Sequence, residues 1–174
     1  MTEQLIEVDA RLLQEVADRA LIQDLIARYA FFGDYGPNES FADLFTPDGT
    51  WVIAGTDVVV RGRDQLVQLV TAVRDNAPGA HHMQSNHVVD LDGDRATGKV
   101  ELNVFLLRPE EIYSNTHGWY EDVYVKVDGR WLIESRTIHL SADSMQVAST
   151  GKIGEHTAPM FAELGRLFGG EGHA

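Results

Sequence analysis

A long run at the start of the chain places apolar side chains at the spacing of a helix that buries one face. The apolar positions recur every three or four residues: Leu21, Leu25, Tyr29 and Phe32, widened by Ile22, Ile26 and Ala30. This pattern predicts a helix over residues 3–32 that ends at Gly33, with Asp34 immediately after it. A helix C-terminus disfavours a carboxylate by about 0.3–1 kcal/mol, so we expect another group to hold Asp34.

Shorter segments follow before the pattern changes. Helical spacing over residues 39–45 predicts a short helix, and turn-forming residues at 46–49 end it. The β-branched runs on either side of residues 54–57 predict a hairpin. Residues 62–76 then return to helical spacing and predict a second long helix.

From residue 80 onward, apolar and polar positions alternate with a period of two. Strands are predicted at four places: residues 88–91, 100–107, 119–127 and 131–140. Tight turns separate successive strands, so an antiparallel meander is expected, and helices followed by such a sheet predict the α+β class. We expect a single domain over residues 1–150 and a tail over 151–174 whose helix, at 158–168, caps a pocket.

Composition narrows the classes of partner. The chain carries 27 acidic residues against 14 Lys and Arg, a formal net charge of −13, so its surface repels nucleic-acid phosphates. Cysteine is absent, which excludes disulfides, thiolate nucleophiles and Cys-based metal sites. No apolar run approaches the roughly 20 residues of a membrane span. We expect a soluble, cytoplasmic protein that binds neither nucleic acid nor membrane.

A cluster of polar residues at 81–87 is the main candidate for chemistry. It contains His81, His82 and His87, and a neutral imidazole accepts a proton near physiological pH when a carboxylate such as Asp34 orients it. The alternative for Asp34 is a solvated turn. A metal site is not favoured, because the histidines lack helical i, i+4 spacing and strand alternation separates them. No phosphate-binding glycine loop occurs, so no cofactor is expected.

Strand alternation predicts which of these side chains face inward. His82 and Asn86 share one face, and His81 and His87 share the other. Arg136 shares a face with Glu134, so it serves either as an anion site or as half of a structural ion pair with that glutamate.

Several short motifs occur in a family-typical order: Arg28-Tyr29 with Asp34; Leu44-Phe45 with Asp48-Gly49 and Trp51; Gly62-Arg63-Asp64 with Leu66; His82 with Asn86; Asp92-Gly93-Asp94 with Ala96; and Gly129-Arg130-Trp131-Leu132-Ile133 with Arg136. Over roughly residues 10–145 the chain resembles the SnoaL-like branch of the nuclear transport factor 2 superfamily. The pattern is most similar to the bile acid 7α-dehydratase and hexachlorocyclohexane dehydrochlorinase groups, with scytalone dehydratase further away.

The resemblance implies a cone-shaped α+β barrel, in which a curved antiparallel sheet wraps the long N-terminal helix and leaves an apolar pocket. It implies catalytic roles, as base, orienter, acid and anion site, for residues that match the family's motifs: His82, Asp34, Tyr29 and Arg136. The residues expected to bind substrate are one amide and three aromatic side chains: Asn86, Trp51, Phe32 and Phe105.

The expected function is that of a cofactor-independent lyase, a dehydratase or dehydrohalogenase acting on a hydrophobic polycyclic or alicyclic small molecule. An isomerase or polyketide cyclase would use the same Asp–His pair. A non-catalytic ligand-binding or assembly subunit is the alternative from another class, because a fold does not imply an activity. Epoxide hydrolysis would need a second carboxylate that the sequence does not place. An outer sheet face rich in Val, Trp and Tyr suits a homodimer or homotrimer.

Overall fold

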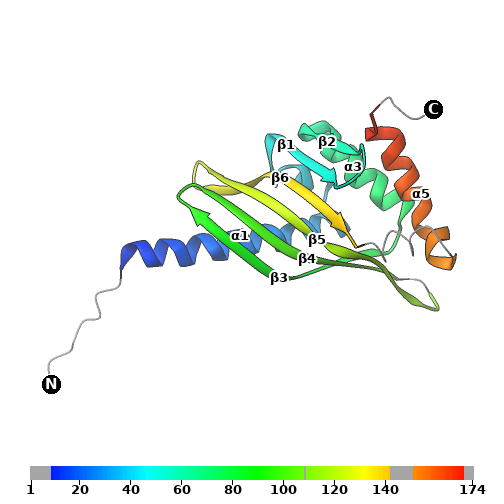
Figure 1. The fold of residues 1–174 in the computed structure, drawn as a ribbon, viewed down its shortest axis with the longest axis horizontal. Coiled ribbons are helices and arrows are strands. Elements are labelled where there is room, and N and C mark those ends of the chain that lie inside the picture. The colour runs from blue at the N-terminus through cyan, green and yellow to red at the C-terminus, as the bar shows by residue number, and fades with distance from the viewer. Residues whose placement is uncertain (1–8, 108, 142–150, 171–174) are drawn as a thin grey trace, which may run out of the picture.

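The computed structural model describes residues 9–107, 109–141 and 151–170 (Figure 1). Its helices and strands follow in chain order: α1 (Ala10–Asp34), α2 (Asn38–Ala42), β1 (Phe45–Ile53), β2 (Val59–Arg61), α3 (Gly62–Asn76), β3 (Ala80–Asp92), β4 (Arg95–Leu107), β5 (Ile112–Val127), β6 (Arg130–Leu140) and α5 (Gly151–Phe168). Among the helices described, none is long and apolar enough to cross a membrane.

Helix α1 forms because its polar and apolar positions separate into two faces. Asp9 caps its N-terminus by accepting a hydrogen bond from the backbone N–H of Arg11 at 2.9 Å. The buried face carries Ile22, Leu25 and Tyr29. The predicted helix is therefore confirmed over the described part of the chain, and it runs on to include Asp34. The predicted start at residue 3 lies outside the described residues.

The strands form one six-stranded sheet in the order β2-β1-β6-β5-β4-β3. Strands β3 to β6 are an antiparallel meander, and β1 pairs with β6 in parallel. The α+β prediction is confirmed, and the sheet stays open with α1 packed against it. In Figure 1, α1 crosses behind the sheet, while α3 and α5 lie together at one end of it. Strand β1 includes the turn predicted at residues 46–49, and its pairing with β6 is interrupted there, since Phe45 lies opposite Ile133 and Thr50 opposite Ser135.

Two bulges change which side chains face inward. In β3 the pairing shifts between Ser85 and Val88, and Asn86 adopts a positive φ of 50°. In the pairing of β5 with β6, Val123 lies opposite Ser135 and Tyr124 lies opposite Ile133. Glu134 is therefore an extra residue in β6. An extra residue of this kind inverts the alternation of the residues beyond it. The strand faces predicted from strict alternation therefore fail beyond each bulge.

The buried carboxylate of Asp18, in α1, binds side chains from β5 and β6. Asp18 is only 4% exposed. Its carboxylate accepts hydrogen bonds from Trp131 Nε1 at 2.9 Å and from Lys126 Nζ at 2.8 Å. The Lys126 ammonium also lies 5.1 Å from the centre of the Trp131 ring. The three side chains fix the N-terminal half of α1 to β5 and β6.

Replacing Asp18 with asparagine should lower the free energy of unfolding at neutral pH by about 1–3 kcal/mol. Burial by itself would raise the pKa of Asp18, but hydrogen bonds from Lys126 and Trp131 outweigh it and hold that pKa below its usual 3.8. A carboxyl group with a lowered folded-state pKa stabilises fully above its unfolded pKa and loses that contribution as pH falls through the folded pKa. In urea titrations, the gap between wild type and variant should narrow below about pH 4. A gap that stays constant down to about pH 2 would contradict this assignment.

Candidate active site

The last residue of α1 and the third residue of β3 meet side by side. Asp34 Oδ1 lies 2.6 Å from His82 Nδ1, and Asp34 Oδ2 accepts the backbone N–H of His82 at 2.8 Å. The side chains are largely buried, at 6% exposed for Asp34 and 16% for His82. His82 thus satisfies both carboxylate oxygens, which explains why an acid is tolerated at this helix end.

This geometry defines the tautomer of the imidazole. An ionised carboxylate only accepts hydrogen bonds, so Nδ1 of His82 carries the proton that it shares with Asp34. Nε2 is then left with its lone pair. A histidine held in this way can accept a proton at Nε2, and Asp34 stabilises the resulting imidazolium. The pair therefore has the geometry of a general base and its orienting carboxylate.

Arg74 supports the pair from α3 and was missed by the sequence analysis. Its Nε donates to the carbonyl of Gly33 at 2.8 Å, and its Nη2 donates to the carbonyl of Phe32. These are terminal carbonyls of α1, the negative end of the helix dipole. The guanidinium thus offsets the field that would otherwise repel Asp34. A basic residue in the last turn of the predicted 62–76 helix was the available signal.

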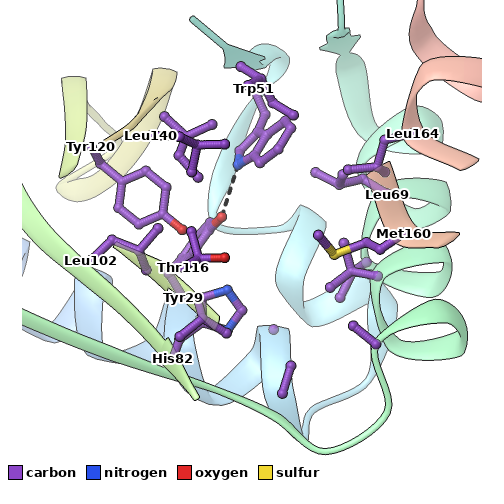
Figure 2. A pocket seen from close by; sticks show the side chains of 18 of the residues that line it. Tyr29, Trp51, Leu69, His82, Leu102, Thr116, Tyr120, Leu140, Met160 and Leu164 are labelled. Carbon is purple, nitrogen blue, oxygen red and sulfur yellow. Dashed lines mark hydrogen bonds between the residues drawn. The ribbon is translucent and has the colours of Figure 1, made fainter. Parts of the chain in front are cut away.

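His82 faces an apolar cavity of about 70 Å³ between the sheet, α1, α3 and α5 (Figure 2). On the same measure a single water needs roughly 10–15 Å³, so there is room for more than one water. In Figure 2, His82, Tyr29 and Thr116 lie on one side, and Leu69, Met160 and Leu164 lie on the other. The polar groups of the lining are few: Tyr29, Trp51, His82, Thr116 and Tyr120.

Two tyrosine hydroxyl groups belong to the polar side of this cavity. Trp51 Nε1 donates to the Tyr29 hydroxyl at 3.0 Å, which leaves the Tyr29 proton able to donate to another group. The Tyr120 ring meets the Tyr29 ring edge-on, with the ring centres 5.6 Å apart. Burial raises the pKa of Tyr120 far above its ordinary value, and its interaction with Tyr29 adds to the effect. Tyr120 therefore remains a neutral donor.

Tyr120 was not assigned to the site by the sequence analysis. Alternation along residues 119–127 is compatible either with the core or with an outer face that serves a dimer. Tyr120 and Tyr124 are both buried, at 1% and 0% exposed, so they do not form an outer surface. Tyr120, Asp122 and Tyr124 are two residues apart along the strand and share its buried face. This spacing was the sequence signal that could have placed the two tyrosines inside.

Arg136 does not line the cavity. Its Nε and Nη2 donate to Asp122 at 2.8 and 2.6 Å, and both side chains are fully buried. The guanidinium carbon lies 4.0 and 4.1 Å from the ring centres of Tyr29 and Tyr120. Burial by itself would lower the pKa of Arg136, but the Asp122 carboxylate reverses the direction and raises it.

The predicted ion pair between Arg136 and Glu134 is wrong. Glu134 instead accepts two hydrogen bonds from Arg95 at the surface, the longer of which is 3.1 Å. The bulge at Glu134 is the physical reason, because it places the glutamate and Arg136 on different faces of β6.

Of the residues expected to bind substrate, the structure places only Trp51 in the cavity lining. Asn86 is exposed and donates to Glu101, so its predicted inward orientation is wrong. The bulge that turns Asn86 outward also turns His87 inward, where its Nε2 lies 3.3 Å from the buried Tyr124 hydroxyl. His87 was predicted to face outward. Phe32 and Phe105 are half-buried outside the lining.

The histidines of the 81–87 cluster have separate neighbours. His81 Nδ1 is hydrogen-bonded to the Tyr35 hydroxyl, His82 to Asp34, and His87 to Tyr124. Within residues 9–107, 109–141 and 151–170, no three His, Asp or Glu side chains are grouped as metal ligands.

Known proteins resemble the chain in both sequence and fold. A sequence model of the SnoaL-like domain matches residues 14–137. An uncharacterized Mycobacterium tuberculosis protein is 27% identical over 126 residues, which cover 70% of this chain and 84% of the relative. A solved Mycobacterium tuberculosis protein of unknown function superposes with a TM-score of 0.81 at 25% identity, covering 90% of this chain and 94% of that one. A proposed scytalone dehydratase from Novosphingobium aromaticivorans gives 0.64 at 23% identity, covering 73% and 86%, which shows a shared fold alone.

Proposed function

The chain belongs to the SnoaL-like domain family of the nuclear transport factor 2-like superfamily, whose members include dehydratases, isomerases and cyclases, and from that premise we propose that it is a cofactor-independent lyase. The proposed reaction is a dehydration or dehydrohalogenation of a hydrophobic alicyclic or polycyclic small molecule. The observation that carries the proposal is the Asp34–His82 pair, whose imidazole lies in the wall of an apolar cavity. A buried base beside an apolar cavity suits the removal of a proton from carbon.

In the proposed step, Nε2 of His82 removes a proton from a carbon next to a carbonyl group. The electron pair of the broken C–H bond forms the new C=C bond, and the hydroxide or halide on the neighbouring carbon leaves with its own electron pair. A departing hydroxide takes the proton from His82 and becomes water, whereas a halide leaves as the anion and the imidazolium then releases its proton to solvent. Asp34 stabilises the imidazolium in between, and Tyr29 donates a hydrogen bond to the carbonyl oxygen or to the leaving group.

Arg136 has an indirect role in this proposal. It contacts the rings of Tyr29 and Tyr120 and is paired with Asp122, so it acts as a positioning residue behind the two phenols. The anion site expected from the sequence is thereby assigned to the tyrosine hydroxyls. Neutral hydroxyl donors in a low-dielectric site stabilise a developing oxyanion without a formal positive charge.

An isomerase or cyclase is the second candidate, and the tyrosine pair favours it. A carbonyl oxygen held by Tyr29 and Tyr120 becomes an enolate once His82 has taken the neighbouring proton, and the proton or the carbon chain can then return at another position. Both candidates share the first step, so a test of that step precedes the choice between them.

The experiment follows hydrogen exchange and product mass together. Wild type and a His82→Ala variant are incubated in D₂O with a panel of neutral cyclic ketones, hydroxyketones and haloketones. Deuterium uptake next to the carbonyl that depends on His82 would establish proton abstraction. Loss of water or hydrogen halide would then indicate a lyase, and a mass-neutral product an isomerase or cyclase. A folded wild type that binds the ketones without exchange or turnover would overturn the catalytic proposal in favour of a binding subunit.

A further inference from the structure

The cavity is lined almost without charge. Among the described residues, no Lys, Arg, Asp or Glu side chain belongs to the lining. The titratable groups that face it are the imidazole of His82 and the hydroxyls of Tyr29 and Tyr120. The pKa of Tyr120 is raised, chiefly by burial, so that phenol stays neutral. A bound ligand therefore meets hydrogen-bond donors and the imidazole of His82.

The cation behind the two tyrosine rings is closed off from a ligand. Arg136 is fully buried, and the rings of Tyr29 and Tyr120 lie 4.0 and 4.1 Å from its guanidinium carbon. Asp122 neutralises it through two hydrogen bonds. Its Nη1 has no hydrogen-bond partner among the described residues, so it is a cationic donor that a ligand carboxylate could seek. Reaching it would require moving a tyrosine ring.

The nearest formal negative charge lies directly behind the base. Asp34 is hydrogen-bonded to the far nitrogen of the His82 ring, at 2.6 Å. A ligand carboxylate close to Nε2 would be repelled by Asp34 across one imidazole ring, in surroundings of low dielectric constant. It would also lose its hydration without gaining a cation in return, a large cost for any buried charge. Both effects act against an anion and leave a neutral molecule unaffected.

We propose that this cavity selects an uncharged ligand with one carbonyl or hydroxyl oxygen and rejects carboxylates of the same skeleton. The oxygen of the ligand accepts hydrogen bonds from Tyr29 and Tyr120, and its apolar body faces Leu69, Met160 and Leu164. The inference rests on the proposed function, whose substrate class it specifies. The substrate of the reaction is then a neutral hydroxyketone or haloketone, and an acid enters only when masked, for example as an ester.

Matched ligands test the selection for charge. Acetophenone and benzoate form a small pair, and 2-acetonaphthone and 2-naphthoate form a larger pair with nearly equal shapes within each pair. Calorimetric titration of the wild type at about pH 7.5 should show tighter binding of at least one ketone than of its carboxylate, by about tenfold or more. Equal or tighter binding of both carboxylates would overturn the proposal, and so would the failure of both ketones to bind at millimolar concentration.

A gain of carboxylate binding provides the complementary test. Leu140 lines the cavity and is half-buried at the end of β6. A Leu140→Lys variant should bind 2-naphthoate about tenfold more tightly than the wild type does, because the new ammonium pairs with the carboxylate. Leu140→Met is the control of similar length without charge and should keep the preference for the ketone. An unchanged naphthoate affinity in a folded Leu140→Lys protein would contradict the placement of the carboxylate in this cavity.

Binding and turnover separate the two proposals. Ketone-selective binding without hydrogen exchange that depends on His82 would overturn the proposed lyase and leave the charge selection standing. His82-dependent exchange on ketones together with tight carboxylate binding would support the enzyme and overturn the charge selection. The imidazole resonances of His82 locate the ligand, since a ketone bound in this cavity should shift them.

Discussion

Replacing Asp34 with asparagine should lower the His82-dependent rate by about 10²- to 10⁴-fold while the chain stays folded. Asp34 accepts two hydrogen bonds from His82, one from Nδ1 and one from the backbone N–H. An asparagine can accept only one of them with its oxygen, and its amide group donates at the other position. With the oxygen on the backbone N–H, the amide donates to Nδ1 and shifts the ring proton to Nε2. The lone pair that faces the cavity is then lost.

The measurement is kcat for deuterium exchange or elimination, with folding checked by circular dichroism. Asp24→Asn is the matched control on the same helix, because Asp24 is exposed and pairs only with Arg28 among the described residues. It should keep the wild-type rate. Combining Asp34→Asn with His82→Ala should cost no more than His82→Ala alone, since the two residues act as a unit. A wild-type rate in the Asp34→Asn protein would show that the carboxylate does not orient the base.

Replacing Asp122 with alanine should lower the free energy of unfolding by about 3–5 kcal/mol, because it leaves the Arg136 charge buried and unpaired. Both side chains of this pair are fully buried, and Asp122 also accepts the Tyr124 hydroxyl at 2.5 Å. For a chain of this length, such a loss corresponds to a fall in Tm of roughly 6–20 °C. Urea and thermal unfolding followed by fluorescence measure it directly.

The exposed pair between Arg95 and Glu134 provides the control. Glu134→Ala breaks the contact with Arg95, where both side chains are about half exposed, and should cost no more than about 1 kcal/mol. A double variant, Asp122→Leu with Arg136→Met, removes both buried charges and should recover much of the stability lost in Asp122→Ala. If Asp122→Ala proves as mild as Glu134→Ala, the buried pair does not hold the core as described.

The helices and the antiparallel meander could be predicted from the sequence, because both rest on periodic burial, but the parallel pairing of β1 with β6 was not predicted. The predicted boundaries of the helix at residues 62–76 coincide with those of α3. The resemblance to the SnoaL-like family is confirmed by the match over residues 14–137. Asp34 and His82 were also singled out together. Their contact could be expected only from the family's motifs, because 48 residues separate them along the chain.

The bulges could not be predicted, and most misplaced side chains trace back to them. Strict alternation has no means of marking the extra residue near Asn86 or at Glu134, since neither carries a glycine or proline signal. The pairing of Arg136 with Asp122 depends on the second bulge and on which face of β5 is buried. The sequence shows Asp122 between Tyr120 and Tyr124, but it does not show that Arg136 is the partner of this aspartate.

The walls of the cavity have two different origins along the chain. The polar lining comes from within residues 14–137, the span that matches the family: Tyr29, Trp51, His82, Thr116 and Tyr120. Met160, Phe161 and Leu164 come from α5, beyond that span. Part of the apolar wall therefore comes from outside the matched span, while the rest of it, including Leu69, lies within that span. A change of side chains in α5 would therefore alter the shape of the cavity while leaving His82, Tyr29 and Tyr120 in place.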